Sequence, residues 1–429
     1  MLIDFTVENF RSIKEPVTLS AVAQKGRAVE RDGKNTSRDY IKADADIAPT
    51  FLVAGRGFEL LPVIGIFGAN ASGKTNVVMA LDKLLDLMAN GNSDLHAPSL
   101  PALESVTPFG LSKTNSASPI QFSLRVIVGG VIYTYSLALN QQRVVEERLD
   151  HRRPTAKRNS LLFQRRWDEH TNQYTWKNGE ELGAYRRLQE SIKEHEIFLS
   201  LLTTRFNVDV IQAFANWTRL RWQGLGHEDF NHAVSIRQLT RMGQEWKKRV
   251  VHIVRQFDTG LSDIEVEPGQ FGSPEQRLVA VHHYGGAKVR WPFEEESTGT
   301  QRLFDLANKI LSCLASGTLI LEDELGSNIH PNITREIVRL FQSPVTNPKR
   351  AQLIFTSHDN TLQQRNLLRR DQIWFTAKRD DGSTELYPLT DFKPRNDLAI
   401  DKAYLDGRFG AVPSLPDEEE LLMEPELAR

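Results

Sequence analysis

The stretch "LPVIGIFGANASGKTNVVMALDKLLDLMANG" constrains the fold of this chain more than any other. The apolar run from Pro62 to Phe67 predicts a buried strand, and the apolar spacing after Thr75 predicts an amphipathic helix that Gly91 ends. The eight residues between them match the glycine-rich loop that wraps phosphates between a strand and a helix. A strand, this loop and a helix in succession predict an α/β fold with a nucleotide site.

Each part of the loop has a chemical reason. Gly68 and Gly73 let the backbone approach the phosphates, Lys74 reaches the β- and γ-phosphates, and the Thr75 hydroxyl is a ligand for Mg²⁺. The candidate nucleotide-binding residues of this segment are Gly68, Asn70, Ala71, Ser72, Gly73, Lys74, Thr75 and Asn76.

A second apolar run, Leu319 to Leu321, leads directly to Glu322, Asp323 and Glu324. A phosphate loop needs a carboxylate for magnesium at the end of a neighbouring strand, and we assign this role to Asp323. We assign Glu324 the role of general base for the attacking water. A shift in register would exchange these roles with Glu322, and an acidic surface turn is the alternative without chemistry.

Two further segments add candidate residues. The strand from Leu353 to Phe355 is followed by His358, which we predict to sense the γ-phosphate and to help orient the water. In "EEESTGTQRLFDLANKIL", a turn with Ser297 and Gly299 opens an amphipathic helix. Backbone N–H groups and the helix dipole make the start of such a helix attractive to an anion.

The phosphate loop, the Ser-x-Gly turn, the strand ending in Asp-Glu and the strand ending in His follow one another in this order. In this order the chain resembles the ABC-type ATPases. The resemblance implies an α/β fold, an ABC-type P-loop NTPase head whose N- and C-terminal lobes form one ATPase core, with ATP and Mg²⁺ as cofactors. It also implies that Ser297 and Gly299 bind the γ-phosphate on a second subunit, within a homodimer or higher homo-oligomer that has composite ATP sites.

The N-terminal "IDFTVENFRSIKEPVTLSAVA" is similar to the opening of the SMC-like and OLD-like branch. With "LPVIGIFGANASGKTN", "ESTGTQRL" and "DELGSNIHP", the chain resembles stand-alone AAA-family ATPases of the RloA/AriA type, as in the PARIS anti-phage defence system. This resemblance implies that Arg11 approaches the nucleotide, with an ordinary surface arginine as the alternative. It makes Gln121 the candidate for the glutamine that completes the magnesium site. The chain departs from the transporter signature at Glu296, where leucine is common.

The pattern of the chain predicts four parts. Residues 1–140 form the N-terminal ATPase lobe, with a hairpin at Gly129-Gly130, and residues 276–413 form the C-terminal lobe. Residues 141–275 lack a sustained heptad repeat, which predicts a compact helical insertion. Residues 414–429 form an acidic tail suited to interactions.

Composition limits the environment and the partners. A net charge of −2 over 429 residues means that any attraction to nucleic acid must be local. The single cysteine, Cys313, excludes an internal disulfide and fits a reducing cytosol. No apolar run reaches the about 18 residues that a membrane span needs, and the N-terminus lacks a signal-peptide core. We therefore expect a cytoplasmic protein with no membrane partner.

The segment from Arg143 to Trp167 carries the one marked basic region. Cations with nearby aromatic rings are suited to nucleic-acid phosphates and bases, but a solvated face balanced by acidic residues is the alternative. The residues concerned are Arg143, Arg148, Arg152, Arg153, Lys157, Arg158, Phe163, Arg165, Arg166 and Trp167, with Glu146, Glu147 and Asp150 among them. His227 and His232 lack partners at zinc-site spacing.

Three classes of function remain. The first is a sensor or switch that controls a separately encoded effector, a Toprim-like or other nuclease or a toxin, in anti-phage defence, with nucleic acid or a phage protein as the trigger. The second is an SMC-like DNA-repair or remodelling ATPase that binds DNA through the basic insertion. The third is a self-contained nuclease, but Asp44 and Asp46 follow a polar segment instead of a strand. A chain with an ATPase core and no effector favours the first class.

Overall fold

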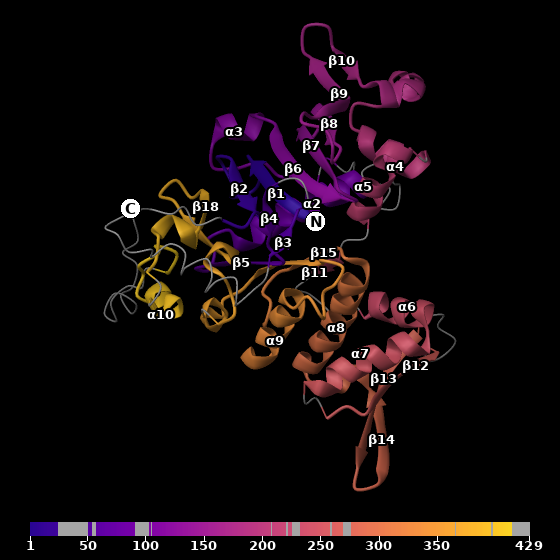
Figure 1. The fold of residues 1–429 in the computed structure, drawn as a ribbon, viewed down its shortest axis with the longest axis vertical. Coiled ribbons are helices and arrows are strands. Elements are labelled where there is room, and N and C mark those ends of the chain that lie inside the picture. Colours follow the sequence, from indigo (N-terminus) through magenta and orange to yellow (C-terminus); the bar gives the residue numbers. More distant parts are fainter. Residues whose placement is uncertain are drawn as a thin grey trace, which may run out of the picture.

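The computed structural model describes twelve parts of the chain (Figure 1). They are residues 1–24, 50–53, 57–90, 103, 105–206, 208–219, 222–224, 232–257, 260–268, 276–364, 366–395 and 398–413. The predicted acidic tail, Asp44, Asp46 and His227 lie outside the described residues.

The core of the α/β fold is a six-stranded sheet in the order β11-β15-β16-β5-β17-β18. Its strands are parallel except for β18, and every residue of β5, β15 and β16 is buried, as continuous apolar runs require. The strands are β5 (Val63–Gly68), β11 (Trp222–Gly224), β15 (Leu319–Glu322), β16 (Gln352–Thr356), β17 (Ile373–Lys378) and β18 (Thr384–Pro388).

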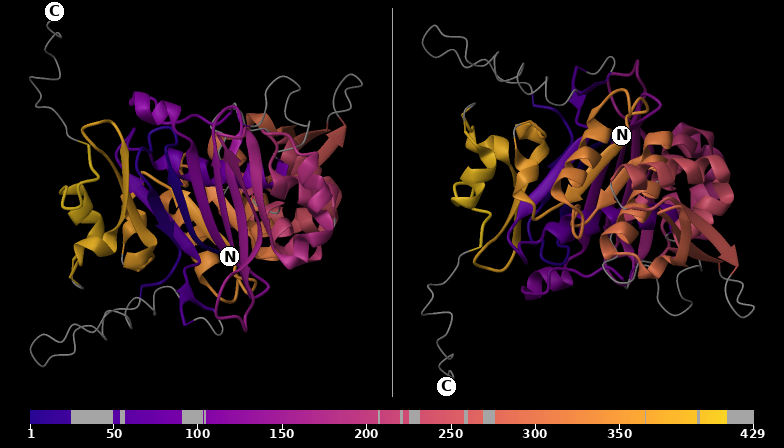
Figure 2. Two further views of the ribbon diagram at one scale, coloured as in Figure 1. Left: turned by 90° about the horizontal axis from the view of Figure 1, so that it is seen from above. Right: turned by 90° about the horizontal axis from the view of Figure 1, so that it is seen from below.

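A seven-stranded antiparallel sheet in the order β10-β9-β8-β7-β6-β1-β2 forms the other layer (Figure 2). The predicted hairpin at Gly129-Gly130 joins β6 to β7. The strands are β1 (Leu2–Glu8), β2 (Val17–Ser20), β6 (Ile120–Val128), β7 (Val131–Leu139), β8 (Val144–Arg152), β9 (Ser160–Asp168) and β10 (Gln173–Asn178).

Helix α2 (Lys74–Asn90) lies between these two sheets and packs against β1 on one side and β5, β15 and β16 on the other. The apolar positions predicted for this helix are buried in one continuous core. Gln352 also joins the two sheets, because its amide accepts a hydrogen bond from Leu2 N (2.5 Å) and donates to the carbonyl oxygens of Leu2 (3.2 Å) and Leu61 (3.0 Å). The antiparallel sheet and the parallel sheet are therefore held as one body.

The prediction of a helical insertion over residues 141–275 is wrong for its first part, where β8, β9 and β10 extend the antiparallel sheet. Two of the buried side chains in these strands are charged, Glu147 and Arg165. They interrupt the alternation of apolar and polar residues from which a strand is predicted. A 3₁₀ helix, Glu180–Glu190, follows the last of these strands. The α-helices of the segment are α4 (Phe198–Arg205), α5 (Asp209–Arg219), α6 (Ala233–Met242) and α7 (Gln244–Gln256).

The C-terminal half begins with a small sheet, β12 (Asp263–Pro268), β13 (Gln276–Tyr284) and β14 (Ala287–Pro292), whose hairpin extends away from the body (Figure 1). Helix α8 (Thr298–Ser316) packs against α7, and α9 (Pro331–Gln342) covers β16 and β5. The remaining short elements are β3 (Phe51–Leu52), β4 (Glu59–Leu60), α3 (Lys113–Ala117) and α10 (Ile400–Leu405), with 3₁₀ turns at Phe293–Glu295, Asn360–Gln363, Arg370–Gln372 and Leu389–Phe392. Within the described parts, no helix has both the length and the apolar character that crossing a bilayer demands.

A buried ion pair fixes the start of α4 on the antiparallel sheet. Arg165 and Glu147 have fully buried side chains 2.8 Å apart. The Glu147 carboxylate also accepts hydrogen bonds from Tyr135 Oη (3.0 Å) and from the backbone N–H groups of Phe198 (2.9 Å) and Leu199 (2.8 Å). The acid therefore completes the first turn of a helix while it neutralises an arginine.

We predict that Arg165→Ala lowers the free energy of unfolding by about 3–5 kcal/mol, because it leaves the Glu147 carboxylate buried without its cation. The neighbouring Arg166 is an exposed arginine 3.8 Å from Glu146, so Arg166→Ala is the matched control and should cost at most about 1 kcal/mol. Urea unfolding followed by tryptophan fluorescence measures both. Equal losses of unfolding free energy in the two variants would show that the buried Glu147–Arg165 pair contributes no more to stability than the exposed pair.

Candidate functional site

The glycine-rich loop connects the end of β5 to the start of α2, and two of its glycines have no room for a side chain. A Cβ on Gly68 (φ +154°) would lie 2.4 Å from the carbonyl oxygen of Thr376, and one on Gly73 (φ +101°) would lie 2.0 Å from Thr384 Oγ1. The strands β17 and β18 thus support the loop from outside, and the tip residues Asn70 and Ala71 are exposed. Glycine is needed for this close contact as well as for the turn.

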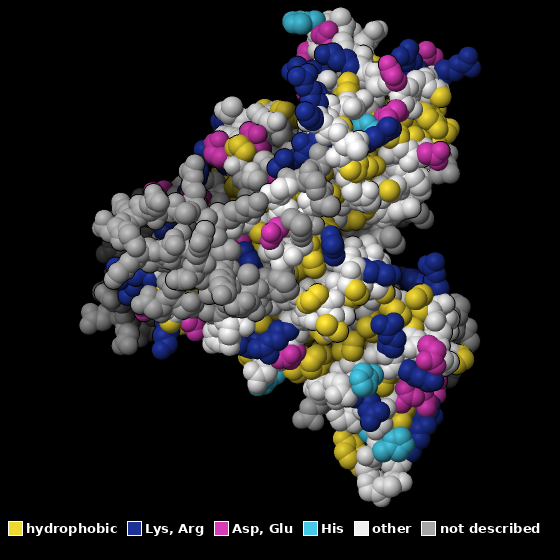
Figure 3. Space-filling view, viewed as in Figure 1, with side chains coloured by type: hydrophobic (Ala, Val, Ile, Leu, Met, Phe, Trp, Pro, Cys, Tyr) yellow, Lys and Arg dark blue, Asp and Glu magenta, His cyan; other side chains and the backbone are white. Residues whose placement is uncertain are grey.

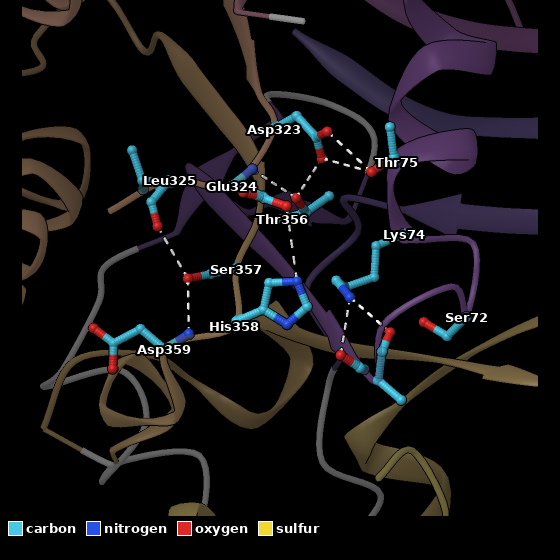
Figure 4. A network of polar contacts seen from close by, with 12 residues as sticks. Ser72, Lys74, Thr75, Asp323, Glu324, Leu325, Thr356, Ser357, His358 and Asp359 are labelled. Carbon is cyan, nitrogen blue, oxygen red and sulfur yellow. Dashed lines mark hydrogen bonds and ion pairs between the residues drawn. The ribbon is translucent and has the colours of Figure 1, made fainter. Parts of the chain in front are cut away.

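Lys74 is buried at the first position of α2, and its ammonium group points back into the loop (Figure 4). Nζ donates hydrogen bonds to the carbonyl oxygens of Gly68 (2.9 Å) and Ala69 (2.8 Å). Burial lowers the pKa of Lys74 to about 8, against the opposing effect of the Asp323 and Glu324 carboxylates. An anion with more than one charge would restore the charge of this group.

The structure brings Asp323 to the phosphate loop, although the two are far apart in sequence. Thr75 Oγ1 donates to Asp323 Oδ2 (2.9 Å) and lies 3.2 Å from Oδ1 (Figure 4). Thr356, at the end of β16, donates its hydroxyl to Asp323 Oδ1 (2.5 Å). A hydroxyl and a carboxylate side by side are oxygen ligands of the kind that Mg²⁺ prefers, so these residues fit the metal.

Glu324 follows Asp323 with a left-handed backbone conformation (φ 52°), which is uncommon for a residue with a side chain. Its N–H donates to Thr356 Oγ1 (2.8 Å), which holds the strained residue in place. Its half-exposed carboxylate lies 3.9 Å from Nε2 of His358. Burial and the nearby Lys74 ammonium lower the pKa of His358, while Glu324 and Asp323 act in the opposite direction, so the ring is held toward its neutral form.

Glu322 lies on the other face of β15, as alternation along a strand requires. Its buried carboxylate is 3.7 Å from Arg302 and 3.5 Å from Lys309, both on α8. The structure therefore brings Asp323, and not Glu322, to Thr75. Arg302, which no motif in the sequence predicted, also donates to the carbonyl oxygens of Asp323 (3.2 Å) and Glu324 (2.8 Å). The one available signal was its spacing of seven from Lys309, which places both cations on one helix face.

The turn before α8 presents Ser297 at the surface. Ser297 is the N-cap of the helix, and its Oγ accepts a hydrogen bond from Thr300 N (3.1 Å). A Cβ on Gly299 would lie 2.6 Å from the carbonyl oxygen of Asn328, so the turn rests directly on the loop after Glu324. Among the described residues, no hydrogen bond or ion pair joins Ser297 or Gly299 to the phosphate loop of the same chain.

The N-terminal turn reaches the phosphate loop through Ser12, which sequence analysis also missed. Asn76 Nδ2 donates to Ser12 Oγ (2.6 Å), and Ser12 Oγ shares a hydrogen bond with Thr384 Oγ1 (2.7 Å). Arg11, the exposed residue beside it, has φ 51° and its guanidinium lies over the ring of Phe10. This places Arg11 one residue from a direct contact of the loop, and its role with a nucleotide stays a prediction.

Gln121, the predicted third ligand for magnesium, is exposed on β6, where it pairs with Glu8 of β1. This position belongs to the antiparallel sheet, whereas Thr75 and Asp323 follow strands of the parallel sheet. Among the described residues, no hydrogen bond or ion pair joins Gln121 to Thr75. Its role in a magnesium site is therefore unsupported by the geometry and stays a prediction.

His232, one of the two histidines set aside as metal ligands, is bonded to Asp305 (3.0 Å) and Gln301 (3.3 Å). Over the residues that the structure describes, no group of three or more His, Cys, Asp or Glu side chains is arranged to hold a metal ion. Cys313 is buried, and burial raises its pKa to about 12.

One protein family and several solved structures are similar to this chain. The family described as "AAA domain, putative AbiEii toxin, Type IV TA system" matches residues 63–362. Among solved structures, an SMC head bound to the C-winged helix domain of ScpA is 13% identical, with 94% of this chain and 99% of that chain covered and a TM-score of 0.44. The SMC head domain from Thermotoga maritima is 12% identical, with 90% and 98% covered and a TM-score of 0.42. No curated protein matches the sequence.

We predict that binding of ATP takes up protons at a pH of about 8.5, and that the part of this uptake that belongs to Lys74 is almost absent at a pH of about 6.5. The pKa of Lys74 is about 8 without an anion, so part of the side chain is neutral at the higher pH. Phosphate oxygens stabilise the ammonium form, raise this pKa and draw in the proton. Titration calorimetry in buffers with different heats of ionisation measures the number of protons.

His358→Ala is the control for this measurement, because His358 also lies beside Lys74. Its removal should leave the uptake at the higher pH unchanged. Binding without proton uptake at the higher pH would mean that Lys74 does not contact the phosphates.

Proposed function

Since this chain belongs to the AAA-domain family described as a putative AbiEii toxin of a type IV TA system, we propose that it binds and hydrolyses ATP between two copies that close head to head. The observation that carries this proposal is the meeting of Lys74, Thr75, Asp323 and Glu324 at one edge of the parallel sheet. Their side chains are those that phosphoryl transfer to water requires.

In this proposal the Lys74 ammonium exchanges its two carbonyl partners for β- and γ-phosphate oxygens. Thr75 and Asp323 would hold Mg²⁺, which would neutralise charge on the phosphate oxygens. Glu324 takes a proton from the water that attacks the γ-phosphorus, and the bond from that phosphorus to the bridging oxygen breaks, so ADP leaves with the electron pair. His358, held toward its neutral form 3.9 Å from Glu324, orients the water.

In this proposal the second copy supplies Ser297 and the backbone N–H groups at the start of its α8 to the phosphate loop of the first. Ser297 is exposed at the first turn of α8, where unpaired backbone N–H groups and the helix dipole favour a phosphate. In a closed pair these groups bind the γ-phosphate held by the partner. Support comes from the rigid seating of the turn against Asn328, which fixes the N–H groups before any contact is made.

The cycle of closing and opening then acts as a sensor or switch for a separately encoded effector in anti-phage defence, with a nuclease or toxin as the effector. The resemblance to the RloA/AriA type supports this role, as does the family description, which refers to a toxin–antitoxin system. Nucleic acid or a phage protein would be the trigger.

Direct binding of DNA through the basic region is less well supported. Figure 3 shows Lys and Arg side chains over β8–β10 with Asp and Glu among them. Arg165 is buried, and most of the others face acids: Arg143 with Glu194, Arg148 with Asp150, Arg153 with Glu181 and Arg166 with Glu146. A surface balanced in this way attracts phosphates weakly.

We predict that Glu324→Gln keeps the affinity for ATP and lowers the rate of hydrolysis about 10²- to 10⁴-fold, because the attacking water loses its base. The closed pair should accumulate with ATP. Phosphate release and gel filtration measure the two effects. Glu322→Gln is the matched control, since Glu322 faces Arg302 and Lys309 instead of the loop. If Glu322→Gln were the slow variant, the assignment of the base would be wrong.

We predict that Ser297→Arg binds ATP normally but does not hydrolyse it, because the added cation blocks the contact with the partner's γ-phosphate. Mixing Ser297→Arg with Lys74→Ala should recover part of the activity. A mixed dimer has one site in which the intact phosphate loop of the Ser297→Arg chain faces the intact Ser297 turn of the Lys74→Ala chain. Random mixing of equal amounts gives roughly a quarter of the normal number of sites. Normal hydrolysis by Ser297→Arg alone would rule out the shared site.

A further inference from the structure

Glu296, the residue where this sequence departs from the common leucine, points away from the surface that presents Ser297. Its side chain is 7% exposed, and a single oxygen, Oε1, accepts hydrogen bonds from His282 Nε2 (2.7 Å) and Trp291 Nε1 (2.7 Å). Both of these hydrogen bonds are made inside the protein. The Glu296 carboxylate is therefore directed at the β13–β14 hairpin.

His282 also has contacts on both of its ring nitrogens. The ring is 3% exposed on β13, and its second nitrogen, Nδ1, lies 2.9 Å from the carbonyl oxygen of Gly260. Both ring nitrogens thus lie within hydrogen-bonding distance of an oxygen atom. The ring also stacks on Trp291 at a centroid distance of 4.2 Å, so its orientation is fixed by packing and by hydrogen bonds.

The backbone of the same turn is held from the other side. Gln301 Nε2 donates to the carbonyl oxygens of Glu296 (2.8 Å) and Glu294 (3.0 Å). The side-chain oxygen of the same glutamine, Gln301 Oε1, lies 3.3 Å from His232 Nε2. The residue just before Ser297 is therefore fixed through its side chain by the hairpin and through its carbonyl by α8.

We infer that His282 is a positioning residue, which through Glu296 sets where Ser297 is presented to a nucleotide held by a second copy. This inference rests on the proposed shared ATP site. Without the His282–Glu296 hydrogen bond, the turn stays bonded to α8 through Gln301 but loses this contact with the hairpin. Ser297 then shifts relative to the phosphate held by the partner. A small displacement of a positioned group is enough to lower catalysis on the order of 10- to 100-fold.

The effect of His282 in one chain is limited to one of the two ATP sites of a dimer. His282 acts on the site formed with the partner's loop and leaves its own chain's Lys74 and Thr75 untouched. A residue that only supported the fold would instead affect both sites and the binding of ATP.

The test uses His282→Phe, which keeps a ring to stack on Trp291 and removes both donors. We expect it to retain the affinity for ATP and to hydrolyse on the order of 10- to 100-fold more slowly. Mixing it with Lys74→Ala should recover activity to the level reached by the Ser297→Arg mixture. His283→Phe, the same change one residue along on the exposed face of β13, is the matched control and should keep normal activity.

Two changes at Glu296 provide a second measurement, which also serves if His282→Phe does not fold. Glu296→Gln keeps an oxygen for both donors and should retain most of the activity. Glu296→Leu keeps the shape but removes the acceptor, and it should behave as His282→Phe does, including recovery on mixing with Lys74→Ala.

The outcomes separate the inference from the function on which it rests. Recovery in the Ser297→Arg mixture but not in the His282→Phe and Glu296→Leu mixtures would overturn the positioning role and leave the shared site standing. Recovery in none of these mixtures would overturn the shared site, and the inference with it. Loss of activity in His283→Phe as large as in His282→Phe would also overturn the positioning role.

Discussion

Parallel pairing of β15, β16 and β5 is the constraint on which the rest of this structure depends. The register Leu353↔Val63 on one side of β16 and Leu353↔Ile320 on the other brings the carboxyl ends of three strands to one edge. Lys74, Thr75, Asp323, Glu324 and His358 follow the ends of these strands, which is where parallel sheets place their ligands. Thr75 and Asp323 meet there because backbone hydrogen bonds elsewhere in the sheet align them.

The sequence was sufficient where chemistry and periodicity agreed. The strand, loop and helix around Lys74 were predictable because glycine spacing and apolar runs allow few alternatives. The choice between Glu322 and Asp323 required the structure, since a one-residue shift along a strand exchanges its two faces. Ser12 and Arg302 had no local signal, because each matters through a contact with a residue distant in the chain. The strands β8–β10 were missed since the buried pair Glu147–Arg165 imitates the pattern of a charged surface.

Glu296 and Glu147 are both acids with buried side chains, although acidic residues are usually found at the surface. Each is a carboxylate taken into the interior, and each completes a local structure: Glu147 the first turn of α4, and Glu296 the turn before α8. Buried acids of this kind are costly unless every oxygen is bonded or the charge is neutralised. The two glutamates therefore indicate where the backbone must not move, one at the base of α4 and one beside Ser297.

The position of β5 also bears on how the chain matures during synthesis. Its two neighbours, β16 and β17, come from the last third of the sequence, so this fully apolar strand emerges from the ribosome long before either edge can be paired. The antiparallel sheet can close earlier, because its strands all precede residue 179. A nascent chain therefore carries an exposed, aggregation-prone segment at the heart of its future ATP site, and shielding by chaperones would matter most in that interval.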